Sequence, residues 1–217
     1  MNENMEKNSV AKEKKSIMQT LKSFWKTNSD TVVKLFVHQF GLTVFGLLLY
    51  FAAEVSGNKP LVIGLGIFST LFYLFLLYVL AWDVGAKDKI RIDGGRLERD
   101  RFKGAKFAFA GMIPNLIMAI LVLIGYLCID KSITDEAGKL LEPAWAISLY
   151  VVVQFLGLYL NGMYLGIGDV VGIAYQPYYL FIIILPAIIV CGLGYYLGSY
   201  EKLGILTSLP ATGKKKR

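Results

Sequence analysis

Five long apolar runs, separated by polar stretches, constrain this chain more than any other feature of its sequence. Each run holds roughly 20 residues, the length at which a helix crosses the roughly 30 Å hydrocarbon core of a bilayer. The chain is 55% apolar, whereas a soluble domain averages roughly 45–50%. The sequence therefore predicts an all-α fold, a polytopic transmembrane helical bundle of about five apolar helices. The expected spans are 35–53, 61–82, 107–129, 144–168 and 178–200.

Most of the basic residues lie in three stretches, and their distribution predicts how the bundle is oriented. Of the 23 Lys and Arg, seven lie in 1–34, eight in 83–106 and five in 201–217. Loops rich in Lys and Arg remain on the cytoplasmic side of a membrane. We therefore expect a cytoplasmic arm at 1–33, a cytoplasmic loop at 83–106 and a cytoplasmic basic tail at 201–217. The net charge of +7 follows from these stretches, so nucleic acid is not an expected partner.

The fourth apolar run is open to two interpretations, because five full crossings would place the basic tail outside. It can cross the bilayer completely, or 144–177 can form a hairpin that returns to the outer face and turns near Asn161 and Gly162. The stretch 166–177 carries no Lys or Arg, and the return leg is rich in glycine. Both features favour the broken or re-entrant alternative, since irregular backbone at membrane depth is tolerated where protein surrounds it.

Residues 9–27 of the arm carry the pattern of an amphipathic helix. Apolar side chains recur at helical spacing on one face, and lysines occupy the opposite face. Such a helix lies in the interface and binds anionic lipids of the inner leaflet; the alternative is a solvated helix without membrane contact. Ser29 or Asp30 is expected to cap the start of the first span. The predicted lipid-interface residues are Lys14, Lys15, Lys22, Trp25 and Lys26.

The basic loop contains a segment, 89–92, in which charged and apolar residues alternate, and Gly94 and Gly95 follow it. Alternation of this kind next to a glycine turn predicts a short β-hairpin. The alternative is a solvated loop whose charges serve only to orient the neighbouring spans.

Polar side chains at membrane depth are the candidate binding residues: Asn115, Gln154 and Asn161 near the midplane, with Asp169 at the mouth. Pro114 is expected to kink the third span. Polar groups at this depth face the bundle interior or a water-filled cavity. We expect one polar cavity along a single helical face from Gln154 to Gly168. The alternative is that these amides, with the GxxxG pairs Gly162/Gly166, Gly168/Gly172 and Gly194/Gly198, only hold the helices together.

Residues that could carry catalysis or hold a metal are scarce. His38 is the single histidine, and Cys128 and Cys191 both lie inside apolar runs. A zinc site normally needs three or four His, Cys or carboxylate ligands, so the sequence predicts no metal centre, no cofactor and no catalytic residue. His38 with Gln39 is interpreted as a polar pair at the level of the inner headgroups.

Two classes of function fit these patterns. The first is a non-enzymatic membrane component, either a transport-associated subunit with a membrane-protein partner or a small transporter. The second is an intramembrane or lipid-modifying enzyme, for which Asp169 and Asn161 are the only candidate groups. The absence of a recognisable nucleophile, base pair or metal set in the sequence favours the first class.

Five stretches of the chain carry a resemblance to known proteins: QFGLTVFG (39–46), WDVGAKDKIRIDGGR (82–96), IPN (113–115), NGMYLGI (161–167) and LPAIIVCGLGYYLG (185–198). They resemble a group of small bacterial multi-pass membrane proteins to which no activity is assigned, and the resemblance spans most of residues 34–200. It implies a location in the bacterial cytoplasmic (plasma) membrane. It carries no catalytic residue over to this chain.

Overall fold

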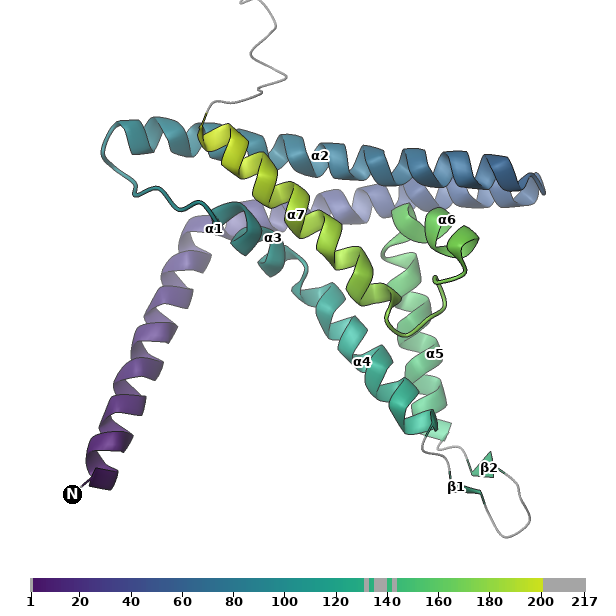
Figure 1. Ribbon diagram of the computed structural model, residues 1–217, viewed down its shortest axis with the longest axis horizontal. Helices are drawn as coiled ribbons and strands as arrows, with labels where there is room; N and C mark the ends of the chain where they lie inside the picture. The colour runs from purple at the N-terminus through teal and green to yellow at the C-terminus, as the bar shows by residue number, and fades with distance from the viewer. Residues whose placement is uncertain (1, 131–132, 135–139, 142–143, 201–217) are drawn as a thin grey trace, which may run out of the picture.

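The computed structural model describes residues 2–130, 133–134, 140–141 and 144–200, with side chains described for 18–20, 22–129 and 145–200. This part of the chain is almost entirely helical (Figure 1). Three of the described helices are long and apolar enough to cross a membrane, and the number rises to five if each of two bent helix pairs counts as one span. The predicted all-α transmembrane bundle is confirmed. The basic tail at 201–217 lies outside the described residues.

Helix α1 (Asn2–Val55) is a single helix of 54 residues, about 81 Å at the rise of 1.5 Å per residue. It covers the predicted amphipathic segment and the first span without a break. The expected cap at Ser29 or Asp30 is therefore wrong. No Pro or Gly occurs before Gly41, so nothing in the backbone favours an interruption there. In Figure 1 the first part of α1 points away from the bundle and the second part lies along α2.

Helix α2 (Lys59–Asp93) runs back along α1 after a short turn in which the Asn58 side chain accepts a hydrogen bond from the Leu61 N–H. The helix continues well past Trp82, so the predicted β-hairpin at 89–92 is wrong. Ion pairs at i,i+4 spacing, among them Lys89–Asp93 at 2.9 Å, favour the helix there. The predicted glycine turn follows the helix, where Gly95 has φ +68°.

The third apolar run forms two helices, α3 (Lys103–Gly111) and α4 (Ile113–Asp130). Their axes differ by 55° across Met112, and Pro114 stands in the first turn of α4. Proline lacks an N–H and disfavours helical geometry in the residue before it. The predicted kink is thus confirmed, as a break just before Pro114.

The fourth apolar run also forms two helices, α5 (Ala144–Tyr159) and α6 (Gly162–Val171), bent by 112°. The predicted break near Asn161 and Gly162 is confirmed. After α6 the chain turns back toward α5. Tyr150 and Gln154 of α5 donate hydrogen bonds to the backbone carbonyls of Tyr175 and Ala174 at 3.0 and 3.1 Å. Gly168 lies in α6, so the expected single face from Gln154 to Gly168 is wrong.

A two-residue strand pair, β1 (Ile133–Thr134) and β2 (Leu140–Leu141), connects α4 to α5, with Ile133 opposite Leu141.

Helix α7 (Tyr179–Ser199) packs along α2 through close glycine contacts. A Cβ on Gly194 would lie 2.7 Å from the Tyr78 carbonyl oxygen, and Gly198 is pressed against the Trp82 backbone. Gly66 of α2 and Gly166 of α6 meet in the same way. Two predicted GxxxG pairs, Gly162/Gly166 and Gly194/Gly198, are therefore packing contacts, whereas Gly172 caps α6 with φ +74°.

The core lies where α2, α6 and α7 meet, around the buried rings of Tyr73, Tyr164 and Tyr179. Away from this core, large apolar side chains such as Leu48, Leu71 and Ile189 are exposed. A soluble protein rarely exposes apolar surface on this scale, whereas lipid covers it without cost. The exposed residues thus agree with a membrane-spanning bundle.

Helix α7 ends beside the end of α2, at a place that we name the charged end, marked by Asp88, Arg91 and Lys103. Tyr195 donates a hydrogen bond to Asp88 at 3.0 Å, and the Arg99 guanidinium lies 4.5 Å from the centre of the Tyr200 ring. The last helix therefore ends at the same end of the bundle as the basic loop. This arrangement agrees with an α5–α6 pair that turns back instead of crossing.

Candidate functional site

A cluster of uncharged polar groups occupies the break between α5 and α6. Asn161 is 2% exposed, and its Nδ2 donates to the side-chain oxygen of Asn115 at 3.2 Å and to the Gly157 carbonyl at 2.8 Å. Its Oδ1 accepts from Gln39 Nε2 at 3.2 Å. Three helices, α1, α4 and α5, thus meet at one asparagine. We name Gln39, Thr43, Asn115 and Asn161 the amide cluster.

The cluster also satisfies the backbone that the break releases. The Leu160 carbonyl oxygen accepts from Thr43 Oγ1 at 2.7 Å and, more weakly, from Gln39 Nε2 at 3.5 Å. An unpaired carbonyl inside hydrocarbon would cost several kcal/mol. Asn161 begins α6 but makes no side-chain cap bond, because its side chain points into the cluster. The broken helix therefore depends on hydrogen bonds from α1.

Gln39 and Thr43 were not among the predicted site residues. The interpretation of His38 and Gln39 as a polar pair is wrong, since Gln39 is buried in the cluster. His38 points elsewhere, with its Nδ1 2.7 Å from the Lys34 carbonyl oxygen. The spacing of Gln39, Thr43 and Gly46 along one face of α1 is a signal that could have found these residues.

An apolar cavity of about 270 Å³ adjoins the cluster. Gln39, Asn115 and the Leu160 segment contribute its polar groups, and Phe40 and Ile117 stand on its exposed side. Ligand sites are commonly apolar cavities with a few convergent polar groups. The cavity has the size for a small molecule, and the amides of Gln39 and Asn115 at its wall are hydrogen-bonded within the cluster.

The structure separates the other two predicted binding residues from this cluster. Gln154 is buried, binds the Ala174 carbonyl and thereby holds the return leg; its Oε1 has no partner among the described residues. Asp169 accepts a hydrogen bond from Tyr50 at 3.3 Å. Tyr50 lies 11 residues beyond Gln39 on α1, about 16 Å along the helix. Asn115 and Asn161 come together as predicted, and Gln154 and Asp169 do not join them.

Of the predicted lipid-interface residues, the side chains of Lys14 and Lys15 lie outside the described residues. Lys22, Trp25 and Lys26 are exposed, as a role at the membrane interface requires. Phe24 packs partly against the core and meets the Trp25 ring edge to face at 6.4 Å.

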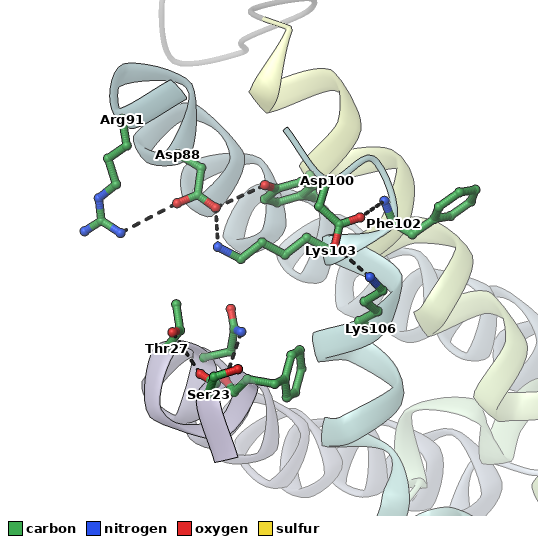
Figure 2. Close-up of polar contacts among 11 residues, drawn as sticks. Ser23, Thr27, Asp88, Arg91, Asp100, Phe102, Lys103 and Lys106 are labelled. Carbon is green, nitrogen blue, oxygen red and sulfur yellow. Dashed lines mark hydrogen bonds and ion pairs between the residues drawn. The ribbon is translucent and has the colours of Figure 1, made fainter. Parts of the chain in front are cut away.

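The charged end is organised around Asp88, whose side chain is only 3% exposed. Figure 2 shows its carboxylate between Arg91 and Lys103, opposite Ser23 and Thr27 of α1. Lys103 Nζ binds Asp88 Oδ2 at 2.5 Å, Tyr195 donates to the same oxygen, and Arg91 lies 3.7 Å from Oδ1. The network joins α2, α3 and α7.

Asp100 makes a second, more exposed network in the same view (Figure 2). It accepts from Lys106 Nζ at 2.7 Å and from the Phe102 backbone N–H at 3.0 Å. Burial alone would raise the pKa of Asp100, but these hydrogen bonds and the neighbouring lysines outweigh it and hold the pKa below its ordinary value.

Among the residues that the structure describes, no three His, Cys, Asp or Glu side chains are grouped so that they could hold a metal ion. Cys191 is buried and Cys128 half-buried, and both are free thiols. No family model, curated protein or solved structure matches this chain.

Proposed function

We propose that this protein is a non-enzymatic membrane component of the transport class, either a small transporter or a subunit that assembles with one. Its working site is the amide cluster at the α5–α6 break, where a small polar solute or ion binds. The proposal includes a bacterial plasma membrane location with the charged end on the cytoplasmic side, as the distribution of Lys and Arg favours.

The observation that supports this function best is the meeting of amides from α1 and α4 with a released backbone carbonyl at one cavity. Gln39, Asn115 and Leu160, which carry these groups, line a cavity that is otherwise apolar. Transporters commonly place their sites at discontinuous helices, because the break exposes backbone groups that a continuous helix uses internally.

The lipid-modifying alternative has less support. It would need a nucleophile or base beside the substrate pocket, and the side chains beside the amide cluster are neutral amides and a threonine hydroxyl. Asp169, the carboxylate considered for that role, is bound to Tyr50 at a different level of the bundle.

Solute-dependent unfolding of the full chain in detergent tests the proposal. Sodium, potassium, acetamide and alanine serve as probes, and a bound probe should raise the wild-type midpoint. Asn115→Ala should lower the midpoint and abolish the rise. Gln154→Leu is the matched control, because it removes a buried amide that does not reach the cavity, and it should lower the midpoint while the rise persists.

The alternative role, in which the cluster only holds the helices together, predicts a different pattern. No probe would then raise the wild-type midpoint, and both variants would simply unfold earlier. Uptake of a stabilising probe into proteoliposomes would separate a transporter from a subunit that binds solute without moving it.

A further inference from the structure

A second cavity, of about 520 Å³, lies between α1, α2 and the start of α3. We name it the charged groove. It lies on a different face of α1 from the amide cluster, since Lys34 and His38 line the groove while Gln39 lines the other cavity. It therefore belongs to neither the amide cluster nor the function proposed for it.

The groove changes character along its length. Leu76, Val79 and Leu80 line one part, toward the middle of α2, and Arg91 lines the part at the charged end. Leu76 and Arg91 are 15 residues apart, about 22 Å along a helix. One part of the groove thus suits hydrocarbon and the other suits an anion.

The charges that line the groove are unequal. Four cations, Lys34, Lys87, Arg91 and Lys103, face three carboxylates, Asp30, Asp83 and Asp88. Two of the carboxylates are already neutralised within the protein, Asp83 by Lys87 at 2.5 Å and Asp88 by Lys103. Asp88 also accepts a hydrogen bond from Tyr195. Asp30 is the third carboxylate.

Arg91 and Lys34 are the cations with capacity left for a ligand. Arg91, which lines the groove, is 63% exposed and touches Asp88 only at 3.7 Å through one nitrogen, so most of its guanidinium is free of protein partners. Lys34 makes no ion pair with any described residue. A guanidinium presents paired donors that match the oxygens of a phosphate.

We propose that the charged groove binds the phosphate of an anionic lipid. The phosphate lies beside Arg91 at the charged end, and Lys34 supplies the second available cation of the groove. The acyl chain lies against Leu76, Val79 and Leu80. Basic pockets between membrane helices take anionic headgroups in this way. A soluble phosphate shares the headgroup chemistry but would leave the apolar part of the groove unused.

Binding to the purified full chain in detergent tests the proposal by native mass spectrometry and thermal unfolding. The probes are phosphatidylglycerol, phosphatidylcholine with the same acyl chains, and sodium phosphate. Phosphatidylglycerol should bind most tightly and raise the midpoint, and added salt should weaken it. Arg91→Gln and Lys34→Gln should each weaken binding about fivefold, the effect of one cation near the lipid surface.

Lys59→Gln is the matched control, because Lys59 is exposed at the opposite end of α2, and it should bind like the wild type. Midpoints without lipid show whether each variant is folded. Equal stabilisation by sodium phosphate would overturn the lipid assignment in favour of a soluble phosphate. Equal binding of the two lipids, or wild-type binding by Arg91→Gln, would overturn the proposal altogether.

Discussion

The amide cluster and the charged end are two polar regions that connect the same bundle in opposite ways. At the amide cluster, buried neutral groups from α1 and α4 meet the α5–α6 break. At the charged end, an ion pair and a tyrosine hydroxyl join α2, α3 and α7. The amide cluster joins its helices through several shared hydrogen bonds, and the charged end joins its helices through one buried carboxylate with three partners.

The difference follows from where each region lies. Charges at the centre of a bilayer are costly, whereas neutral amides need only satisfied hydrogen bonds. Near the end of the bundle, a buried carboxylate can be balanced by Lys and Arg side chains that reach the surface. We therefore expect the charged end to contribute more stability per residue and to respond to pH and salt, and the amide cluster to respond to neither.

The largest effect is expected from Asp88→Ala. It leaves Lys103, only 12% exposed, without its partner, and removing one member of a buried pair costs about 3 kcal/mol. Asp83→Ala is the control, because the Lys87–Asp83 pair is 66% and 51% exposed, and its loss should cost less than about 0.5 kcal/mol. Unfolding of the full chain by SDS in mixed micelles measures both.

The double variant Asp88→Ala with Lys103→Met shows whether the uncompensated lysine causes the loss. It should recover much of the stability that Asp88→Ala removes, because no buried charge then remains at this position. A double variant no more stable than Asp88→Ala would mean that the carboxylate acts mainly through Tyr195.

Next in size is Gly66→Ala, which tests whether α6 packs as closely on α2 as the amide cluster requires. A Cβ on Gly66 would lie 2.9 Å from the Gly166 carbonyl carbon, and separating two backbones costs about 2 kcal/mol. Gly64→Ala, two residues earlier, meets nothing within 4 Å. It should be neutral or slightly stabilising in the same unfolding measurement, since alanine favours a helix.

A smaller effect is expected inside the amide cluster. Asn161→Ala removes hydrogen bonds to Asn115 and Gln39 together and should cost between about 1 and 2 kcal/mol. Gln154→Leu removes a single bond to the Ala174 carbonyl and should cost about 0.6 kcal/mol. Equal losses in SDS unfolding would show that the two asparagines and Gln39 do not act as a unit.

The smallest effect concerns pH. The pKa of Asp100 is lowered in the folded state, so its hydrogen bonds stabilise the fold above the ordinary carboxyl pKa and are lost as the pH falls through the folded value. Stability should therefore decline on acidification, by well under 1 kcal/mol for a residue this exposed. Asp100→Asn should remove that part of the pH dependence, whereas Asn115→Ala should leave the pH profile unchanged.

The sequence predicted the regions of this fold that depend on local composition. Hydropathy placed the apolar runs, and the Asn161–Gly162 and Pro114 positions marked both breaks, because proline and glycine act on the backbone where they stand. The prediction from sequence is wrong at 89–92. The alternation of charged and apolar residues there suggests strands, but i,i+4 ion pairs extend α2. Helix or strand is ambiguous in segments this short.

The site was predicted only in part, for a physical reason. Asn115 and Asn161 are predicted to lie together because they are at the same depth in the membrane. Depth does not show which face of α1 they meet, so the prediction misses Gln39 and Thr43. Gln154 satisfies a carbonyl of the return leg, whose path depends on how α6 packs against Gly66 and Gly46. The spacing of residues along one helix does not show which other helix they contact.

The turn of the chain at the α5–α6 pair creates the amide cluster and brings the end of α7 to the charged end. Cysteine accessibility in intact cells measures it directly. In a background with Cys128→Ala and Cys191→Ala, single cysteines replace Asn58, Gly95, Gln176 and Tyr200. An impermeant thiol reagent should give Asn58→Cys and Gln176→Cys one accessibility, and Gly95→Cys and Tyr200→Cys the opposite one. Five full crossings would instead pair Gln176→Cys with Gly95→Cys and Tyr200→Cys with Asn58→Cys, and that result would contradict the account.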